Sequence, residues 1–448
     1  MSRGTCMVLI VRVLSALFVA FTLALPLGAV AQDEPLIDIV GGRTDPMPVA
    51  LPAFIATGEG AERVSADLSE VIRDDLASSS LFAPIDPAAF IQQLQSVNTP
   101  PRFADWRAID ARVLLVGEVT ALSGGRIQVA ARLWDVGASK QLGTIAFKTP
   151  ATNVRKAGHE IADFVYEQLT GEPGYFDTKI VYVAESGPKT DRRKRLMIMD
   201  QDGANPSILT DGLNFDALTP RFSPTQQQII FLAMFDDRPS QVYLYDIETT
   251  EMEALGSWRG MTFAPRFSTD GRGVLLSIEE AGNTDIARMD LITRRIERLT
   301  RNPAIDTSPS MSPDGRHITF ASDRGGSQQI YVMNADGSDQ RRITFGNGTY
   351  GTPVWSPRGD LIAFTRLYRG RFYIGVVKPD GTGERLLTES YLDEGPTWSP
   401  NGRVIMFFRE NRPGGPVNLY SIDLTGRNLR RVETSTEASD PAWSPLLD

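Results

Sequence analysis

The sequence contains very little cysteine or histidine. Among 448 residues there are one cysteine, Cys6, and two histidines, His159 and His317. A single cysteine excludes an internal disulfide, so the hydrophobic core must hold the fold together. His159 falls on the polar side of a predicted helix and His317 at the exit of a turn, so we expect both at the surface. No HExxH, GxSxG or phosphate-binding glycine motif is present, so any hydrolytic or metal chemistry would depend on Asp and Glu alone.

Clustered positive charge is also scarce. The formal net charge is −9, with 46 Lys and Arg against 55 Asp and Glu. Nucleic-acid binding needs clustered Lys and Arg to contact phosphates, so this balance argues against a nucleic-acid partner. The densest basic run, at residues 192–195, is typical of a solvated hairpin loop.

Long hydrophobic runs are missing apart from one near the start. Arg3 and Arg12 precede an apolar run from Val13 to Leu25, and small residues follow up to Ala31. The run is shorter than the roughly 20 residues that span a membrane. The pattern predicts a secretory signal peptide over residues 1–31 and an exported, soluble mature protein.

A repeat organises the second half of the chain. Six stretches of the form Pro-x-aromatic-Ser, the third with Met311 in place of the aromatic residue, recur at a near-constant period of 43 to 45 residues, and their prolines are Pro220, Pro265, Pro309, Pro353, Pro396 and Pro441. Within one period the sequence predicts four strands: the Pro-containing stretch, HITFAS (317–322) after an SPDG turn, IYVMN (330–334) and RRIT (341–344). A four-stranded unit of this length is typical of a propeller blade.

The first repeat lacks its own first strand. KIVYVA (179–184) matches a second strand, but no Pro-x-aromatic-Ser stretch precedes it, and PAWS at 441–444 is the unused copy. We therefore predict a six-bladed β-propeller over residues 175–448, closed by the C-terminal strand. Closure of this kind leaves no unpaired edge. The repeated aromatic residues are expected to pack between blades; they are Phe222, Phe267, Trp355, Trp398 and Trp443.

The first half of the mature chain has a different pattern. Apolar stripes at 64–76 and 154–169 predict two helices, and two strand-like runs flank Ser123-Gly124-Gly125 as in a hairpin. Residues 32–172 are therefore predicted to form a small α/β domain, with 171–174 as the boundary. The segment from Gln32 to Val49 leaves two interpretations open: an edge strand of this domain, or an arm that docks on another protein.

The loops that lead into the first strands of the blades open at one mouth of the central channel. They carry polar groups that are candidate partner-binding residues: Asp216, Arg259, Asp306, Tyr350, Asp393, Glu394 and Asp440. Aspartate is common in turns for conformational reasons alone, so two interpretations stay open. One is ordinary turn chemistry; the other is a polar mouth that accepts an extended peptide or a cation. The sequence predicts no catalytic residue, no bound metal and no cofactor.

Several of these features together carry a family resemblance. The chain resembles the TolB family of periplasmic Tol-Pal proteins in six features: the signal peptide, the α/β domain, GYFDTKIVYV (174–183), the six repeats, YLDEGPTWSPNG (391–402) and the final PAWSPLL. The likeness covers essentially the whole mature chain. It implies a monomeric, non-enzymatic periplasmic scaffold that supports outer-membrane integrity and constriction during cell division.

The resemblance also implies two partners. The lipoprotein Pal would bind at the channel mouth and link the chain peripherally to the outer membrane. The inner-membrane protein TolA would bind the N-terminal arm, whose candidate residues are Gln32, Asp33, Glu34, Leu36, Ile37, Asp38, Ile39 and Val40. Two alternatives remain at this point: a propeller lactonase or lyase that binds Ca²⁺ through channel carboxylates, and a peptidase-associated propeller.

Overall fold

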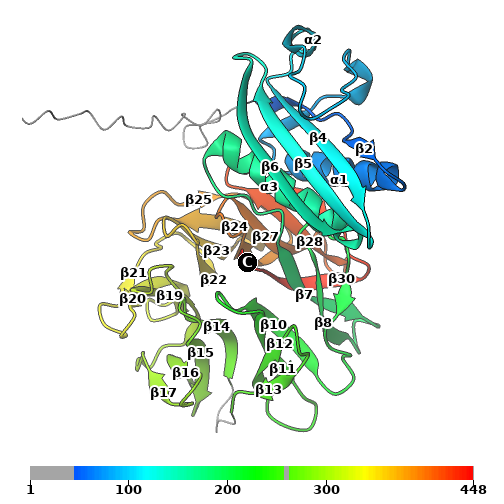
Figure 1. Ribbon diagram of the computed structural model, residues 1–448. Helices are drawn as coiled ribbons and strands as arrows, with labels where there is room; N and C mark the ends of the chain where they lie inside the picture. Colours follow the sequence, from blue (N-terminus) through cyan, green and yellow to red (C-terminus); the bar gives the residue numbers. More distant parts are fainter. Residues whose placement is uncertain (1–44, 257–261, 447–448) are drawn as a thin grey trace, which may run out of the picture.

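The structure is a computed structural model that describes residues 45–256 and 262–446. These residues form an N-terminal mixed α/β domain and a ring of six four-stranded sheets, with the small domain resting on one side of the ring (Figure 1). The predicted signal peptide and the N-terminal arm, residues 32–40, lie outside the described residues.

The N-terminal domain is built on one twisted sheet of six strands. Its order is β3-β1-β4-β5-β6, and β2 pairs with β4. β1, β2 and β3 run parallel to their neighbours, whereas β4, β5 and β6 form an antiparallel meander. The strands are β1 (Met47–Ala50), β2 (Ile55–Thr57), β3 (Phe82–Pro84), β4 (Val113–Leu122), β5 (Arg126–Asp135) and β6 (Lys140–Pro150); the helices are α1 (Ala61–Ser78), α2 (Phe103–Arg107) and α3 (Val154–Thr170), with short 3₁₀ turns at Pro87–Ala89 and Ala151–Asn153.

The two predicted helices and the predicted hairpin are confirmed. α1 buries Leu68, Ile72 and Leu76 of its apolar stripe, and α3 buries Ile161 and Val165 in the same core. The β4–β5 turn contains two glycines with positive φ, a conformation that other residues rarely adopt. α1 ends at Ser78. α3 ends at Thr170, and the chain then crosses to the propeller.

The predicted six-bladed ring and its closure are also confirmed. Blade 1 contains β10 (Asp216–Phe222), β11 (Gln228–Met234), β12 (Gln241–Asp246) and β13 (Met252–Ala254). Blade 2 contains β14 (Thr262–Phe267), β15 (Gly273–Glu280), β16 (Asn283–Asp290) and β17 (Ile296–Arg298). Blade 3 contains β18 (Asp306–Met311), β19 (His317–Ser322), β20 (Gln329–Asn334) and β21 (Arg341–Arg342). Blade 4 contains β22 (Thr349–Trp355), β23 (Ile362–Tyr368), β24 (Arg371–Val377) and β25 (Arg385–Leu386). Blade 5 contains β26 (Leu392–Trp398), β27 (Val404–Glu410), β28 (Val417–Asp423) and β29 (Arg430–Val432). Blade 6 contains β30 (Glu437–Trp443), β7 (Lys179–Ser186), β8 (Arg193–Asp200) and β9 (Ser207–Ile208). Blade 6 has the order β30-β7-β8-β9, so the last strand of the chain completes the first repeat.

The repeated aromatic residues pack between blades, as predicted. Phe267, Trp355, Trp398 and Trp443 are buried in hydrophobic clusters, and Phe222 is half-buried. The Trp398 indole donates a hydrogen bond to the backbone oxygen of Val354 in the preceding blade (3.0 Å). The buried rings therefore connect neighbouring blades in addition to filling the core.

One hydrophobic core crosses from the small domain into the propeller. The ring of Tyr175 lies 5.8 Å from Tyr166 of α3 and 5.8 Å from Trp443 of β30, and all three belong to one buried cluster. At the rim of this contact Glu172 forms ion pairs with Arg358 (2.7 Å) and Arg403. Shared apolar burial of this kind makes the two domains one packed unit.

The expectation that His159 lies at the surface is wrong. The side chain is buried on α3, and its Nδ1 lies 2.6 Å from the Asp75 carboxylate of α1. The other ring nitrogen faces Asp200 of the propeller at 3.9 Å. The neighbouring carboxylates raise the His159 pKa to about 10 against the opposing effect of burial, so the imidazole is protonated at neutral pH. His317 is half-buried and stacks on Trp355.

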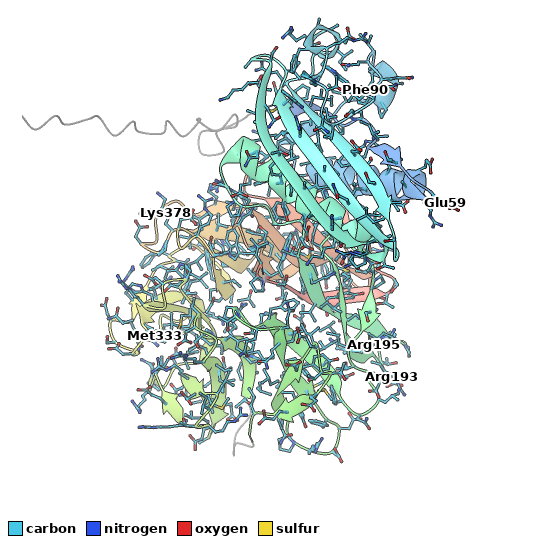
Figure 2. The ribbon with its side chains drawn as sticks, in the orientation of Figure 1. Glu59, Phe90, Arg193, Arg195, Met333 and Lys378 are labelled. Carbon is cyan, nitrogen blue, oxygen red and sulfur yellow. The ribbon has the colours of Figure 1, made fainter. Side chains whose placement is uncertain are left out.

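The basic run at residues 192–195 lies at the predicted β7–β8 hairpin, but it is not simply solvated. Arg192 pairs with Glu437 (2.9 Å) and Lys194 with Glu185 (3.3 Å). Arg193 and Arg195 lie on β8 in the outer half of blade 6 (Figure 2). The positive charge is therefore partly neutralised within the chain.

Candidate partner-binding site

The channel is lined by a ring of strained residues, one from each blade. In every first strand the pairing register shifts around the repeated proline. The residue before each proline has a positive φ between 45° and 64°; these residues are Thr219, Ala264, Ser308, Thr352, Gly395 and Asp440. Five of them are not glycine, so the ring stores backbone strain of a kind that is concentrated at functional sites. All six line one inner cavity of about 110 Å³.

Four charged side chains share this inner cavity. Arg221 and Arg266 come from blades 1 and 2, and Glu394 and Asp440 come from blades 5 and 6. Burial raises the pKa of both carboxyl groups, and the nearby Asp440 raises the pKa of Glu394 further. The channel therefore joins a pair of guanidinium groups to a pair of acids that resist ionisation.

The two ends of the channel differ. We call the end at the loops that lead into the first strands the loop mouth, and the end at the turns between first and second strands the turn mouth. The small domain contacts the turn side, since Arg358 and Arg403 stand in those turns. The loop mouth is the end to which the sequence assigned its candidate residues.

Three of those candidates are fully buried and already have partners. Asp393 accepts two hydrogen bonds from Arg409 (2.7 Å each), and Asp306 accepts two from Arg324 (2.8 and 2.9 Å). The Tyr350 hydroxyl donates to Glu384 (2.8 Å), and burial raises the Tyr350 pKa. Charge-paired groups of this kind fix loop geometry, and their contact with a partner stays a prediction.

The other candidates are divided among three places. The Asp216 carboxylate accepts a hydrogen bond from the Lys194 backbone N–H (2.7 Å) at the start of β10. Glu394 and Asp440 line the inner cavity. Arg259 lies outside the described residues. The structure therefore brings two of the seven candidates together in the channel.

Sequence reasoning missed a group of exposed apolar side chains at the loop mouth. Phe345 is 73% exposed, Leu213 68% and Ile305 46%, and each stands in a loop that leads into a first strand. Met234 is exposed where β11 ends on the same side. Large exposed apolar residues on rigidly held loops are typical of protein-binding surfaces. The signal in the sequence is a bulky apolar residue within a Gly-, Asn- or Pro-rich loop.

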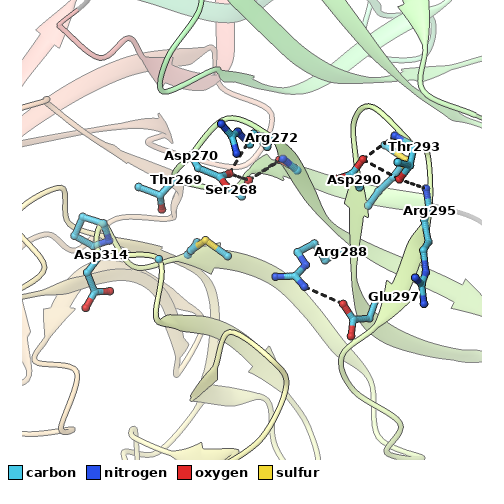
Figure 3. A pocket seen from close by; sticks show the side chains of 15 residues that line it. Ser268, Thr269, Asp270, Arg272, Arg288, Asp290, Thr293, Arg295, Glu297 and Asp314 are labelled. Atoms are coloured by element: carbon cyan, nitrogen blue, oxygen red, sulfur yellow. Dashed lines mark hydrogen bonds and ion pairs between the residues drawn. The ribbon is translucent and has the colours of Figure 1, made fainter.

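A larger cavity, of about 970 Å³, lies between blades 2 and 3. Figure 3 shows its charged lining, in which Arg288 pairs with Glu297 (2.9 Å) and the Asp270 and Asp290 carboxylates accept hydrogen bonds within their own turns. The repeat departs from its pattern at this cavity. Blade 3 carries Met311 where other blades carry Phe or Trp, and Met311 lines the cavity.

A metal centre is the weaker interpretation of the acids around His159. His159, Asp200 and Asp202 lie close enough together to hold a metal ion. However, Lys179 pairs with Asp200, and Arg155 pairs with both Asp200 and Asp202. These cations already neutralise the carboxylates, so the group is best described as an ion-pair network across the domain junction.

Known proteins resemble this chain over nearly its whole length. A model described as the TolB beta propeller domain matches residues 166–447, and one described as the TolB amino-terminal domain matches residues 35–142. The Tol-Pal system protein TolB of Dinoroseobacter shibae is 54% identical over 97% of this chain and 99% of its own length. The crystal structure of TolB from Acinetobacter baumannii is 28% identical, with a TM-score of 0.77 over 91% of this chain and 99% of that one.

Within residues 45–256 and 262–446, no helix is long and apolar enough to cross a membrane. The match to the TolB relative sets aside the lactonase, lyase and peptidase alternatives that the sequence left open. The chain belongs to the TolB family and is a non-enzymatic protein of the Tol-Pal system.

Proposed function

We propose that this chain is a periplasmic scaffold that binds the lipoprotein Pal at the loop mouth of its propeller. The observation that carries the proposal is the set of exposed apolar side chains on the loops there, Phe345 and Ile305 foremost. Burial of such side chains drives association, and a few of them supply most of the binding energy. The buried ion pair between Asp306 and Arg324 stands directly beside Ile305 and fixes the end of that loop. Binding to Pal would link the chain to the outer membrane and to its constriction during division.

The test is calorimetric titration of the mature chain with the soluble domain of Pal. We expect saturable one-to-one binding that weakens at least about tenfold in Phe345→Ala, because truncation of an anchor residue typically costs more than 1 kcal/mol. Ile292→Ala is the matched control, since Ile292 is 85% exposed on the β16–β17 turn, on the opposite side of the propeller. Equal affinity of the wild type and Phe345→Ala would remove the loop mouth as the site.

The second part of the proposal concerns the N-terminal arm. The arm, residues 32–40, binds TolA, and Pal binding shifts the arm between docked and free states. Such coupling is reciprocal, so deletion of residues 32–40 must change the affinity for Pal if the two sites communicate. Titration of the deletion variant measures this, and an unchanged affinity would dismiss the coupling while leaving the scaffold role intact.

A further inference from the structure

The turn mouth of the channel opens into a cup that the proposed function does not use. The cup has a volume of about 430 Å³, and its wall contains the rings of Trp355, Trp398 and Trp443 together with the prolines of the turns. A volume in the range of roughly 300–1,000 Å³ with a mostly apolar wall is typical of small-molecule sites. The cup lies at the end of the channel opposite to the loop mouth.

The floor of the cup carries unbalanced positive charge. Among the described residues that line it, Arg221 and Arg266 are the charged ones, and no acid is present. Glu394 and Asp440 line only the inner cavity beyond this floor. Arg221 and Arg266 line both the cup and the inner cavity. A molecule in the cup therefore meets two guanidinium groups before it meets any carboxylate.

Arg266 stands without a partner among the described residues. It makes no hydrogen bond or ion pair with the described residues, and Arg221 hydrogen-bonds only to the backbone oxygen of Pro220 (2.6 Å) and is attracted to Asp440. Burial and the neighbouring Arg221 charge lower the pKa of Arg266 well below its usual range. A partly buried, unpaired cation beside a second cation is costly. Nearby, the buried Thr219 hydroxyl also lacks a hydrogen-bond partner in the described part of the chain.

We propose that the cup binds a small-molecule carboxylate with an apolar body. The carboxylate would accept hydrogen bonds from Arg266 and Arg221, since a planar guanidinium matches a carboxylate in shape and charge. The apolar body would lie against the tryptophan rings, a wall that does not suit a strongly hydrated inorganic anion. The site stands independently of Pal binding, because the two lie at opposite ends of the channel.

The test uses phenylbutyrate as the probe and the whole mature chain as the protein. Tryptophan fluorescence and calorimetry should both report saturable binding, because three tryptophans line the cup. Phenylbutanol and phenylbutylamine have the same apolar body without the negative charge, and we expect each to bind at least about tenfold more weakly. Equal binding of phenylbutanol, or no saturable binding of phenylbutyrate, would overturn the proposal.

Variants locate the binding on the arginines. Arg266→Gln should weaken phenylbutyrate binding at least about tenfold, and Arg266→Lys should retain part of it. Because Arg266 pairs with none of the described residues and its charge is costly there, Arg266→Gln should not lower the melting temperature below that of the wild type. Arg295→Gln is the control, since Arg295 lines the adjoining cavity between blades 2 and 3 but does not line the cup. If Arg266→Gln and Arg295→Gln bind phenylbutyrate as the wild type does, the proposed site is wrong.

Discussion

His159 shows how a single side chain can join the two domains. It is a buried imidazolium between Asp75 of the small domain and Asp200 of the propeller, and the Gln201 amide donates to the other oxygen of Asp75 (3.0 Å). Burial raises the Asp75 pKa to about 6, so Asp75 is still mostly ionised at pH 7. The pair therefore carries opposite charges in the middle of the domain junction.

We predict that His159→Gln removes much of the pH dependence of stability above neutral pH. A histidine whose pKa is raised by folding stabilises the folded state fully below its unfolded pKa of about 6.5, and this contribution is lost as pH rises toward about 10. At pH 7 the variant should lose about 3–5 kcal/mol, the usual result of removing one partner of a buried ion pair. The free energies of unfolding of the wild type and the variant should approach each other as pH rises from 7 to 10, and denaturant unfolding of both proteins measures this.

His317→Gln is the matched control for that experiment. His317 stacks on Trp355 and forms no ion pair with the described residues, so its replacement should not produce the loss of about 3–5 kcal/mol at pH 7 that is expected of His159→Gln. A His159→Gln variant whose stability parallels the wild type at every pH would contradict the assigned charge state.

The position of His159 could not be predicted from the sequence, for a physical reason. Helical periodicity identifies the apolar stripe of α3, and His159 lies beside that stripe with other polar residues. Its burial depends on Asp200, which is brought to it from another domain. The same limit applies to Asp306 and Asp393, whose arginine partners stand in the adjacent strand or hairpin at positions that vary between blades.

At the scale of the element, the repeat predicted the blades well because it records a local physical requirement. The SPDG turn of blade 3 forms as expected: the Gly315 N–H donates to Ser312 O (2.9 Å), and the Asp314 carboxylate accepts from the Ser312 hydroxyl (2.6 Å). Closure by β30 was also predictable, since one first strand was missing and one copy was left over. The ring of positive φ values was not, because a bulge has no signature in the alternation of side chains.

Blade 3 tests the role of the repeated aromatic residue. We predict that Met311→Trp stabilises the protein by about 0.5–2 kcal/mol, because it fills part of the cavity between blades 2 and 3 and restores the residue of the other blades. Thermal unfolding measures the change. Met289 lines the same cavity but is fully buried, so Met289→Trp should overpack the core and destabilise the protein by about 1–3 kcal/mol. Destabilisation by both variants would mean that the cavity does not arise from Met311 in place of an aromatic residue.

At the scale of the whole molecule, the junction between the domains is packed and does not behave as a flexible linker. The sequence placed the boundary at residues 171–174 from their Gly and Pro content, and the exact domain bounds stay a prediction. In the structure the Asp163 carboxylate accepts hydrogen bonds from the backbone N–H groups of Phe176 (2.7 Å) and Asp177 (3.0 Å). A side chain at Gly174 would collide with Asp163, since an added Cβ would lie 2.0 Å from it. These contacts fix the path of the chain between the domains.

A packed junction has a thermodynamic consequence, and it gives the last prediction. Because one hydrophobic cluster spans both domains, the wild type should unfold in a single transition with equal calorimetric and van't Hoff enthalpies. Tyr175→Ala removes the ring that touches both Tyr166 and Trp443, so it should split or broaden the transition in scanning calorimetry. Phe407→Ala truncates a ring buried inside the propeller, so it should lower the melting temperature without splitting the transition. If Tyr175→Ala keeps one sharp transition like Phe407→Ala, the domains are joined by other contacts, and Glu172 with Arg403 would be the next pair to break.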